Sequence, residues 1–397
     1  MIHAIRQKYN AAFSDEKYAA FLADLNRSYH HQIPFRVAES PVFVDRAFKQ
    51  KLVKASAEII DFLVRPDFKS QTEAAIPATM RVPNETDHTL FLALDFAVVR
   101  DEHDVLQPRL IEMQGFPSLF AWQDFLAARY REKFYCPEGF SSHFGLSRDA
   151  YQMMLNNVLL NGHAPENVVL LEIDPLKQNT AIDFIITQAL TGIAPVHLGH
   201  VRRRGRTLYY LREGKEVPIH RIYNRVIFDE LLQRRDLLLD FNLTDDVDVE
   251  WAGHPNWFFR ISKYTMPLIK SEYIPECRFL SDYQTWPTDL ENFVLKPLFS
   301  FSGSGVIFNV TTSDLESIRQ ETRGQYLLQR KVKYEPVVQA PDGLVKTEIR
   351  LLFLWQEGHA RPTLVTNLAR LSRGEMIGVK FNKDKTWVGG SVCFFED

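Results

Sequence analysis

A lysine followed by a loop of small residues is the feature of this chain with the clearest chemical meaning. Residues 293–308 read as a strand that ends at Lys296, a loop rich in Ser and Gly, and a second strand. The backbone N–H groups of such a loop can close over phosphate oxygens, and the lysine adds a positive charge beside them. The lysine precedes the glycines, so this is not a Walker A motif. The alternative is a tight hairpin that uses Gly303 and Gly305 for backbone reasons alone.

Two strands further along the chain could complete a phosphate site. Residues 326–336 form an apolar strand that turns polar at its end, and residues 345–355 form a strand that carries Glu348 and Arg350. Residues two apart in a strand share one face of a sheet, so this carboxylate and this guanidinium lie side by side. Together they could hold a metal–phosphate group. The alternative is an ordinary ion pair on a solvated face.

This order of lysine strand, glycine loop, hinge strand and acidic/arginine strand resembles the ATP-grasp ligases. In the usual order of that family a Glu-x-Asn metal pair comes next, and nothing after Arg350 matches it. A similar pair, Glu112 and Gln114, lies far upstream instead. The displacement resembles the circularly permuted members, namely the eukaryotic-type glutathione synthetases and the synthetase part of glutathionylspermidine synthase. The likeness runs from about residue 90 to the end, and residues 1–85 match no family.

The resemblance implies an α+β and α/β architecture. It would combine an ATP-grasp fold, in which two α+β subdomains clasp ATP, with a small Rossmann-like parallel-sheet subdomain for the substrate. The strand–helix–strand alternation of residues 168–197 independently predicts a small parallel sheet. We expect residues 1–165 to form a helical region plus a metal-binding hairpin, 166–250 the substrate subdomain, and 251–397 the nucleotide-binding region with its glycine-loop lid.

Two apolar runs, residues 89–99 and 109–114, bracket the polar stretch 100–108 and predict a β-hairpin. The resemblance implies a metal site on this hairpin. Glu112 would be the main ligand, Gln114 follows on the same strand face, and Asp95 lies on the partner strand. Oxygen ligands of this kind, together with phosphates, suit Mg²⁺. Two residues depart from the family pattern: Gln114 stands where the families carry Asn, and Ser300 where glutathione synthetase carries a metal-binding glutamate. The alternative for Asp95 is a cross-strand hydrogen bond.

The nucleotide-binding residues implied by the resemblance come from four segments. Two lysines would reach the phosphates, the glycine loop would form a lid, backbone groups of Lys331 and Val332 would meet the adenine edge, and Glu335 would bind the ribose. The full set is Lys263, Lys296, Ser302, Gly303, Ser304, Gly305, Gln329, Lys331, Val332 and Glu335. The alternative for Lys263 is a solvated helix lysine.

Arginines would bind and orient the substrate. Arg225 resembles a strand-end arginine that holds a carboxylate, Arg100 has the spacing to the metal pair seen in glutathione synthetase, and Arg350 belongs to the acidic/arginine strand. A bidentate guanidinium can fix a carboxylate for attack. A further arginine would close the site, and the sequence leaves open whether this is Arg370 or Arg373.

The reaction implied by the resemblance is ATP-dependent and forms ADP. A substrate carboxylate attacks the γ-phosphate to give an acyl phosphate, and an amine then displaces phosphate to leave an amide. ATP and Mg²⁺ are the implied cofactors, and the substrates would be an amino acid, a short peptide or a polyamine. Two alternatives stay open: an ATP-grasp kinase that phosphorylates a small molecule, and a catalytically degenerate ATP-binding protein.

Composition agrees with a soluble enzyme. Of 397 residues 45% are hydrophobic and 24% charged, and the net charge of −3 calls for neither a nucleic acid nor a membrane. The first residues lack the apolar core of a signal peptide, and three separate cysteines suit a reducing compartment, so we expect a cytoplasmic protein. Four arginines within residues 202–206 read as a solvated turn. A homodimer is compatible with the resemblance.

Overall fold

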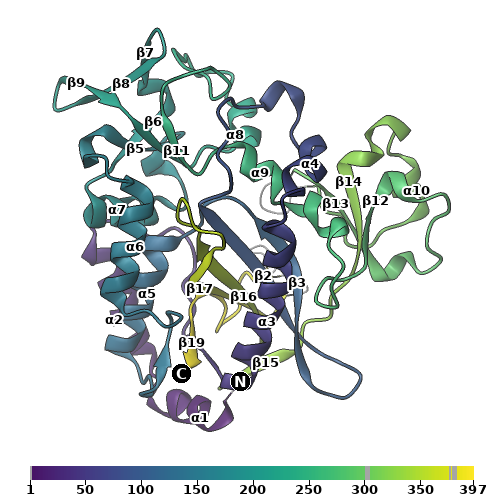
Figure 1. The fold of residues 1–397 in the computed structure, drawn as a ribbon. Helices are drawn as coiled ribbons and strands as arrows, with labels where there is room; N and C mark the ends of the chain where they lie inside the picture. Colours follow the sequence, from purple (N-terminus) through teal and green to yellow (C-terminus); the bar gives the residue numbers. More distant parts are fainter. Residues whose placement is uncertain (1, 300–304, 375–376, 378–381) are drawn as a thin grey trace.

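A six-stranded sheet runs through the middle of the molecule (Figure 1). The computed structural model describes residues 2–299, 305–374, 377 and 382–397. The strand order is β18-β17-β16-β2-β3, β15 pairs with the beginning of β16, and all pairings are antiparallel. The strands are β2 (Phe91–Arg100), β3 (Leu106–Gln114), β15 (Pro336–Ala340), β16 (Gly343–Leu354), β17 (Thr363–Ser372) and β18 (Gly389–Ser391).

Strand β2 is covered on both faces, which explains its sequence. Residues 91–99 are all buried, so the strand reads as a nearly unbroken apolar run instead of an alternation. Helix α3 (Arg46–Leu63) packs on β3, and helix α5 (Phe120–Lys133) packs on β17. Asp95 interrupts the apolar run in the middle of β2 and is therefore a buried charge that needs partners.

A four-stranded sheet is parallel throughout, which confirms the parallel sheet predicted from the sequence. Its order is β11-β10-β5-β6. The chain passes from β5 through α7 to β6 on one side, and from β10 to β11 on the other, so the order reverses between β5 and β10. The elements are β5 (Val168–Glu172), α7 (Ala181–Thr191), β6 (Ala194–His197), β10 (Arg221–Asn224) and β11 (Glu250–Ala252).

A small antiparallel sheet, β12-β14-β13, lies to the side of the six-stranded sheet (Figure 1). One of its faces packs a separate core that includes Phe293, Leu295 and Leu328. Because side chains alternate along a strand, the other face carries Lys296 and Gln329. The strands are β12 (Cys277–Phe279), β13 (Phe293–Pro297) and β14 (Tyr326–Arg330).

Two local predictions are corrected by the structure, and one alternative is ruled out. After the glycine loop, Ile307 forms a single bridge to Leu295 in place of a strand. The strand predicted over residues 326–336 ends at Arg330, and β15 begins only at Pro336. Lys263 is not the solvated helix lysine of the alternative, because it opens a short 3-10 helix (Lys263–Leu268) and is buried.

Helices and shorter strands complete the fold, and the predicted helical N-terminal region is present. Strand β19 pairs with β1 and β4, so the end of the chain lies against residues 42–44. The remaining helices are α1 (His3–Ala12), α2 (Asp15–Ser28), α4 (Phe68–Gln71), α6 (Arg148–Leu160), α8 (Phe228–Gln233), α9 (Asn256–Arg260) and α10 (Thr312–Glu316). The remaining strands are β1 (Val42–Val44), β4 (Phe140–Ser141), β7 (Arg202–Arg204), β8 (Thr207–Arg212), β9 (Lys215–Ile219) and β19 (Cys393–Glu396). The domain boundaries drawn from the sequence stay predictions.

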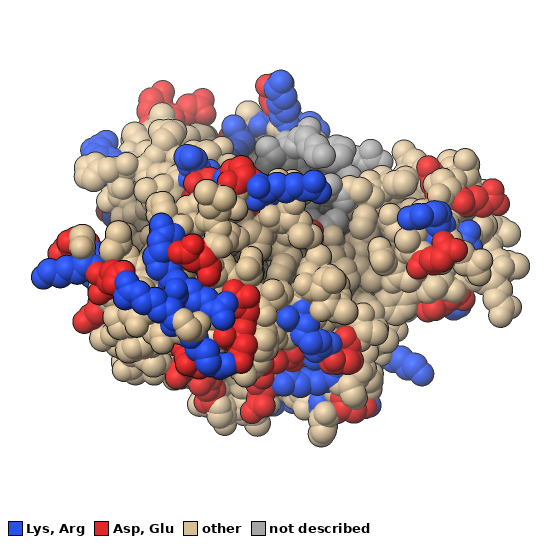
Figure 2. All heavy atoms as spheres, turned by 90° about the horizontal axis from the view of Figure 1, so that it is seen from above, with Lys and Arg blue, Asp and Glu red and all other residues tan. Residues whose placement is uncertain are grey.

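The arginine cluster on the β7–β8 hairpin is neutralised by acidic neighbours. The ion pairs are Arg202–Asp240, Arg203–Asp245, Arg204–Glu216, Arg206–Asp246 and Arg206–Asp248. On the face seen in Figure 2, blue and red side chains accordingly interleave. The hairpin therefore offers mixed charge and not a basic surface, as expected of a solvated turn. Among the described residues, no helix combines the length and apolar character that crossing a bilayer requires.

Candidate functional site

Two lysines, one from the 3-10 helix Lys263–Leu268 and one from β13, lie near a carboxylate on β3. Lys263 Nζ lies 3.6 Å from Glu112 Oε1 on β3. Lys296 lies on strand β13 of the three-stranded sheet. Burial lowers the pKa of its ammonium group; the negative charge of Glu112 raises this pKa, and the positive charge of Lys263 lowers it further. Two lysines from separate elements thus lie near Glu112, with Glu348 also acting on Lys296, and lysines from two elements suit a polyanionic ligand.

A β-bulge determines which way Glu112 points. In the outer part of the β2–β3 hairpin Ala97 pairs with Arg109, so odd-numbered residues of both strands share a face. Further along, the register shifts by one residue and Asp95 pairs with Glu112. Without this shift Glu112 would lie on the other face of the sheet. The bulge therefore places Glu112, and with it Gln114, on the face of Asp95.

Asp95 is held by two arginines. Arg350 lies opposite it in the sheet and binds it through both oxygens, with Nε to Oδ1 at 2.5 Å and Nη2 to Oδ2 at 2.6 Å. Arg370 Nη2 also donates to Oδ2, at 2.6 Å. Burial acts to raise the pKa of Asp95, but the two arginines lower it below its ordinary value. Asp95 is thus an ionised carboxylate whose oxygens both accept from guanidinium groups.

Glu348 extends this network by one row of the sheet. Arg370 lies opposite it and donates to Oε1, and the Tyr334 hydroxyl donates to Oε2. Burial raises the pKa of Glu348 above its ordinary value. The structure also distinguishes the two arginines that the sequence left open, because Arg370 enters this network while Arg373 pairs with Asp342.

Ser118 connects the network to the arginine predicted to bind substrate. Its Oγ accepts a hydrogen bond from Arg350 Nη1 at 3.0 Å. The carbonyl oxygens of Pro117 and Ser118 accept from Arg225 Nη1 at 2.7 and 3.0 Å. The segment that follows β3 therefore brings Arg225 beside the charged cluster of the central sheet.

Arg225 lies at the carboxyl edge of the parallel sheet, directly after β10. Glu172 is the last residue of the neighbouring strand β5, and Asp183 lies in the first turn of α7. The guanidinium of Arg225 stacks between the rings of Phe116 and Phe184, and its Nε is buried without a hydrogen-bond partner among the described residues. Ligands of open parallel sheets bind at this edge, where the strand order reverses. The position suits an anionic group of a substrate.

Glu172 should make stability depend on pH. Burial raises the pKa of Glu172 to about 8, although a hydrogen bond from the Ile173 N–H and the positive charge of Arg225 both act to lower it. Between the ordinary pKa of a glutamate and about 8, the folded chain keeps a proton that the unfolded chain has lost. The stabilisation is therefore full at the acid end of this window and falls as pH rises through it, by at most about 1.4 kcal/mol per pH unit.

Urea denaturation at several pH values tests this prediction. We expect Glu172→Gln to flatten the decline in unfolding free energy between about pH 5 and about pH 8. The matched control is Glu166→Gln, at an exposed glutamate just before the same strand, which should keep the wild-type profile. Parallel profiles for wild type and Glu172→Gln would show that Glu172 is ionised in the folded protein.

Arg100 and Glu335 pair with each other and do not join the cluster. Arg100 Nε lies 3.0 Å from Glu335 Oε1 at the outer end of the β2–β3 hairpin. Arg100 also points to the opposite face of β2 from Asp95, because their positions alternate. This arrangement does not support the catalytic role predicted for Arg100 or the ribose contact predicted for Glu335.

The predicted adenine hinge is only partly available. The Lys331 N–H already donates to the Asn292 carbonyl oxygen at 2.7 Å, and Val332 follows in the link to β15. Gln329 is buried on the face of Lys296, and its Oε1 has no hydrogen-bond partner in the described parts of the chain. A buried acceptor without a donor fits a ligand N–H such as an adenine amino group.

Most of the predicted glycine-loop lid lies outside the described residues. This applies to Ser302, Gly303 and Ser304, and also to Ser300. Gly305, at the end of the loop, has a φ of +71°, and a Cβ there would come within 2.9 Å of Pro297 Cγ. A glycine at this position is therefore required by the backbone.

The residues present do not fit the metal site that the resemblance implied. Both oxygens of Asp95 accept from arginines, and Glu112 faces Lys263, whereas a Mg²⁺ ligand needs a free oxygen lone pair at about 2.0–2.1 Å from the ion. Within the described ranges no group of three or more His, Cys, Asp or Glu side chains is placed to hold a metal ion. The arrangement thus does not support the metal role predicted for Asp95, and the metal roles of Asp95, Glu112 and Gln114 stay predictions.

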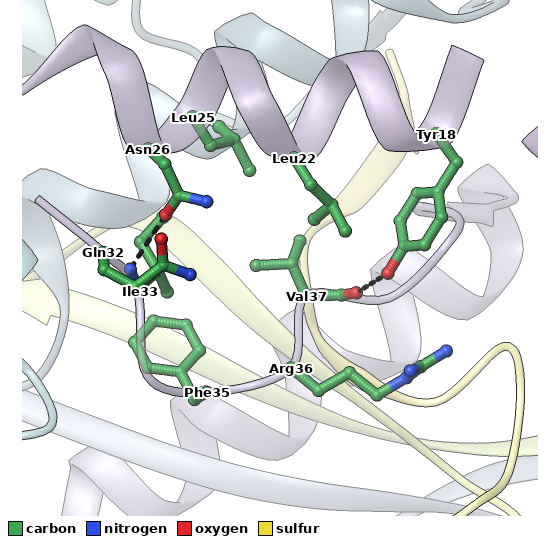
Figure 3. A pocket seen from close by; sticks show the side chains of 9 residues that line it. All are labelled: Tyr18, Leu22, Leu25, Asn26, Gln32, Ile33, Phe35, Arg36 and Val37. Carbon is green, nitrogen blue, oxygen red and sulfur yellow. Dashed lines mark hydrogen bonds between the residues drawn. The ribbon is translucent and has the colours of Figure 1, made fainter. Parts of the chain in front are cut away.

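A cavity of about 260 Å³ opens elsewhere, between α2 and residues 32–37 (Figure 3). Its polar groups are largely engaged within the chain, since the Tyr18 hydroxyl donates to the Val37 carbonyl oxygen and Asn26 Oδ1 accepts from the Ile33 N–H. Figure 1 shows α2 and β13 on opposite sides of the molecule. This cavity is separate from the cluster around Lys296.

Comparisons with known proteins agree with the fold. No protein-family model matches the chain, and no curated protein matches it. The structure is similar to that of a glutathione synthetase-like effector from Globodera pallida in its apo form, with a TM-score of 0.56 and 10% identity, covering 90% of this chain and 94% of that chain. At this identity the likeness shows a shared fold alone. The predicted resemblance is confirmed at that level, and the circular permutation and the ATP-grasp details stay predictions.

Sequence reasoning missed several members of the site. Glu172 had a usable signal, because it ends an apolar strand of the predicted parallel sheet, where ligands bind. Ser118 and Tyr334 had none, since a hydroxyl in a loop gains meaning only from the side chain that reaches it.

Proposed function

We propose that this chain is an ADP-forming, ATP-dependent carboxylate–amine ligase of the circularly permuted ATP-grasp type. The observation that carries the proposal is the ion pair of Lys263 with Glu112 at 3.6 Å, together with the position of Lys296 on the face of β13 where Glu112 and Lys263 both act on it. A shared fold with a glutathione synthetase-like protein supports the same class. Lysines from two separate elements suit a triphosphate, which needs positive charge at more than one phosphate group.

The described residues can be given roles in such a reaction. Lys263 and Lys296 would bind the phosphates of ATP, and Gln329 Oε1 would accept a hydrogen bond from the base. Arg225 would hold a substrate carboxylate at the edge of the parallel sheet, with its guanidinium fixed by two carbonyl oxygens and two aromatic rings. Fixing both reactants in this way lowers the entropic part of the barrier.

In the proposed reaction a carboxylate oxygen attacks the γ-phosphorus, and the bond to the β,γ-bridging oxygen breaks to release ADP. An amine then attacks the acyl carbon, and the bond from this carbon to the bridging phosphate oxygen breaks. Phosphate leaves, the amine nitrogen loses a proton, and an amide forms. Developing negative charge on the transferred group would be stabilised by the two lysines. The proposed substrates are small molecules. An amino acid or a short peptide would supply the carboxylate, and an amino acid, a short peptide or a polyamine would supply the amine.

The test is ADP release with purified protein. Pairs of amino acids, dipeptides and polyamines are screened with ATP, and we expect ADP to form only when a carboxylate and an amine are both present. ADP formation with a hydroxyl compound and no amine would indicate a kinase instead. Absence of ADP with every pair, although ATP binds, would contradict the ligase proposal.

A second candidate is a non-catalytic anion-binding protein. It is favoured by Asp95, whose carboxylate is taken up by Arg350 and Arg370 and is not open to a metal ion. Isothermal titration with ATP and the ADP-release screen together distinguish the ligase from the non-catalytic protein. A non-catalytic anion-binding protein would bind ATP and release no ADP with any substrate pair.

A further inference from the structure

Arg370 lies at the centre of the acidic groups of the central sheet. Its Nη2 donates to Asp95 Oδ2 at 2.6 Å and to Glu348 Oε1. Glu112 is close enough to act on it as well. Burial alone would lower the pKa of Arg370, but Glu348, Asp95 and Glu112 together raise it above its ordinary value. Two carboxyl groups from two strands thus bind one guanidinium, and a third carboxyl group, Glu112, acts on it.

We propose that Arg370 is the built-in cation of this site and that its guanidinium takes the place of a divalent metal ion between Asp95 and Glu348. The chain would then hold these two carboxyl groups together by itself. Any metal ion that arrives with a nucleotide would contact the protein without Asp95 or Glu348. This inference concerns the same cluster as the proposed ligase, but it does not depend on catalysis.

The geometry explains why a metal ion and Arg370 exclude each other. A metal ion bridging Asp95 and Glu348 would have to use oxygens that now accept N–H donors from Arg370. The ion and the guanidinium would also repel each other, because both are positively charged and would bind the same two carboxyl groups. Arg350 reinforces the exclusion, because it occupies the other oxygen of Asp95 at 2.5 Å.

Access to the site is not what excludes a metal ion. Arg370 keeps 38% of its side-chain surface exposed, although the carboxyl groups that it binds are almost fully buried. An ion could therefore approach from the side of Arg370. There it meets a positive charge that already binds both carboxyl groups, so the exclusion is electrostatic, and Arg370→Gln removes the charge that lies between Asp95 and Glu348.

The experiment measures Mn²⁺ binding to the full chain without nucleotide, using the electron paramagnetic resonance signal of the free ion. Arg370→Gln removes the positive charge and keeps a polar side chain of similar reach. The matched control is Arg373→Gln, at the neighbouring arginine that pairs with Asp342. We expect Arg370→Gln to bind Mn²⁺ at least about tenfold more tightly than wild type, and Arg373→Gln to match wild type.

Asp95→Asn supplies the second half of the test. In the wild-type background it should change Mn²⁺ affinity less than about twofold, and in the Arg370→Gln background it should abolish the gain. An unchanged Mn²⁺ affinity in folded Arg370→Gln, as judged by circular dichroism, would overturn the proposal. So would wild-type binding that weakens on Asp95→Asn, a comparison that stands even where Arg370→Gln does not fold. Because no step uses ATP, failure of the ligase screen leaves this result unaffected.

Discussion

Replacing Lys296 with alanine is expected to lower ATP turnover by about 100-fold or more, on the order of 3 kcal/mol in the activation barrier. The reason is that Lys296 lies on the inner face of β13, where its ammonium group faces Glu112 and Lys263 and not the core. Its loss removes positive charge from the position at which negative charge develops on the transferred phosphoryl group. Packing should change little, because the core of the small sheet lies on the opposite face.

Steady-state ADP release measures the effect, and circular dichroism shows whether the variant is folded. Lys270→Ala is the matched control, since Lys270 is exposed and should leave turnover unchanged. The lowered pKa of Lys296 adds a second readout: ATP affinity should fall as pH rises through a range below the ordinary pKa of lysine, and this decline should be weaker in Lys296→Ala. Wild-type turnover in the folded alanine variant would show that the phosphates lie elsewhere.

The sequence was sufficient to predict the parts of the fold that depend on local pattern. The parallel sheet follows from the alternation of strands and helices in residues 168–197. The β2–β3 hairpin follows from two apolar runs around a polar stretch. In each case the residues that decide the structure are close together in the chain.

The charged network could not be predicted, because it depends on register between distant strands. Glu348 and Arg350 were expected to share a face, and they do, but their partners come from β2 and β17. A one-residue change of register would send these partners to the other face of the sheet. The bulge that turns Glu112 towards Asp95 has no signature in the sequence either.

The partners of Asp95 could not be predicted for a related reason. A carboxylate and an arginine on one strand can bind a metal–phosphate group, or they can bind other charged groups of the chain, and only the spatial neighbours decide. Arg370 is such a neighbour, and the sequence could not distinguish it from Arg373. The outcome follows from the cost of burial, because a buried carboxylate such as Asp95 must find positive charge from whatever source is nearest.

Asp95→Ala is expected to cause the largest loss of stability, about 3–5 kcal/mol, because it leaves two arginines facing a position without a carboxylate. Arg350 would lose its two hydrogen bonds to Asp95 and keep the one to Ser118 Oγ, and Arg370 would keep its hydrogen bond to Glu348. Urea denaturation measures the loss. The matched control is Arg373→Ala, which removes a more exposed ion pair with Asp342 and should cost about 1 kcal/mol or less.

Acid sensitivity provides an independent check on the same network. The pKa of Asp95 is lowered in the folded protein, so its ion pairs stabilise the fold above the pKa of the unfolded chain, and this contribution is lost as pH falls through the lower, folded value. Wild type should therefore lose stability in this acidic range more steeply than Asp95→Asn, which has no carboxyl group to protonate. Two outcomes would contradict this role of Asp95: equal slopes of unfolding free energy against pH in wild type and Asp95→Asn, or a wild-type urea midpoint in Asp95→Ala. Either would mean that the arginines find other partners and that Asp95 does not hold β2, β16 and β17 together.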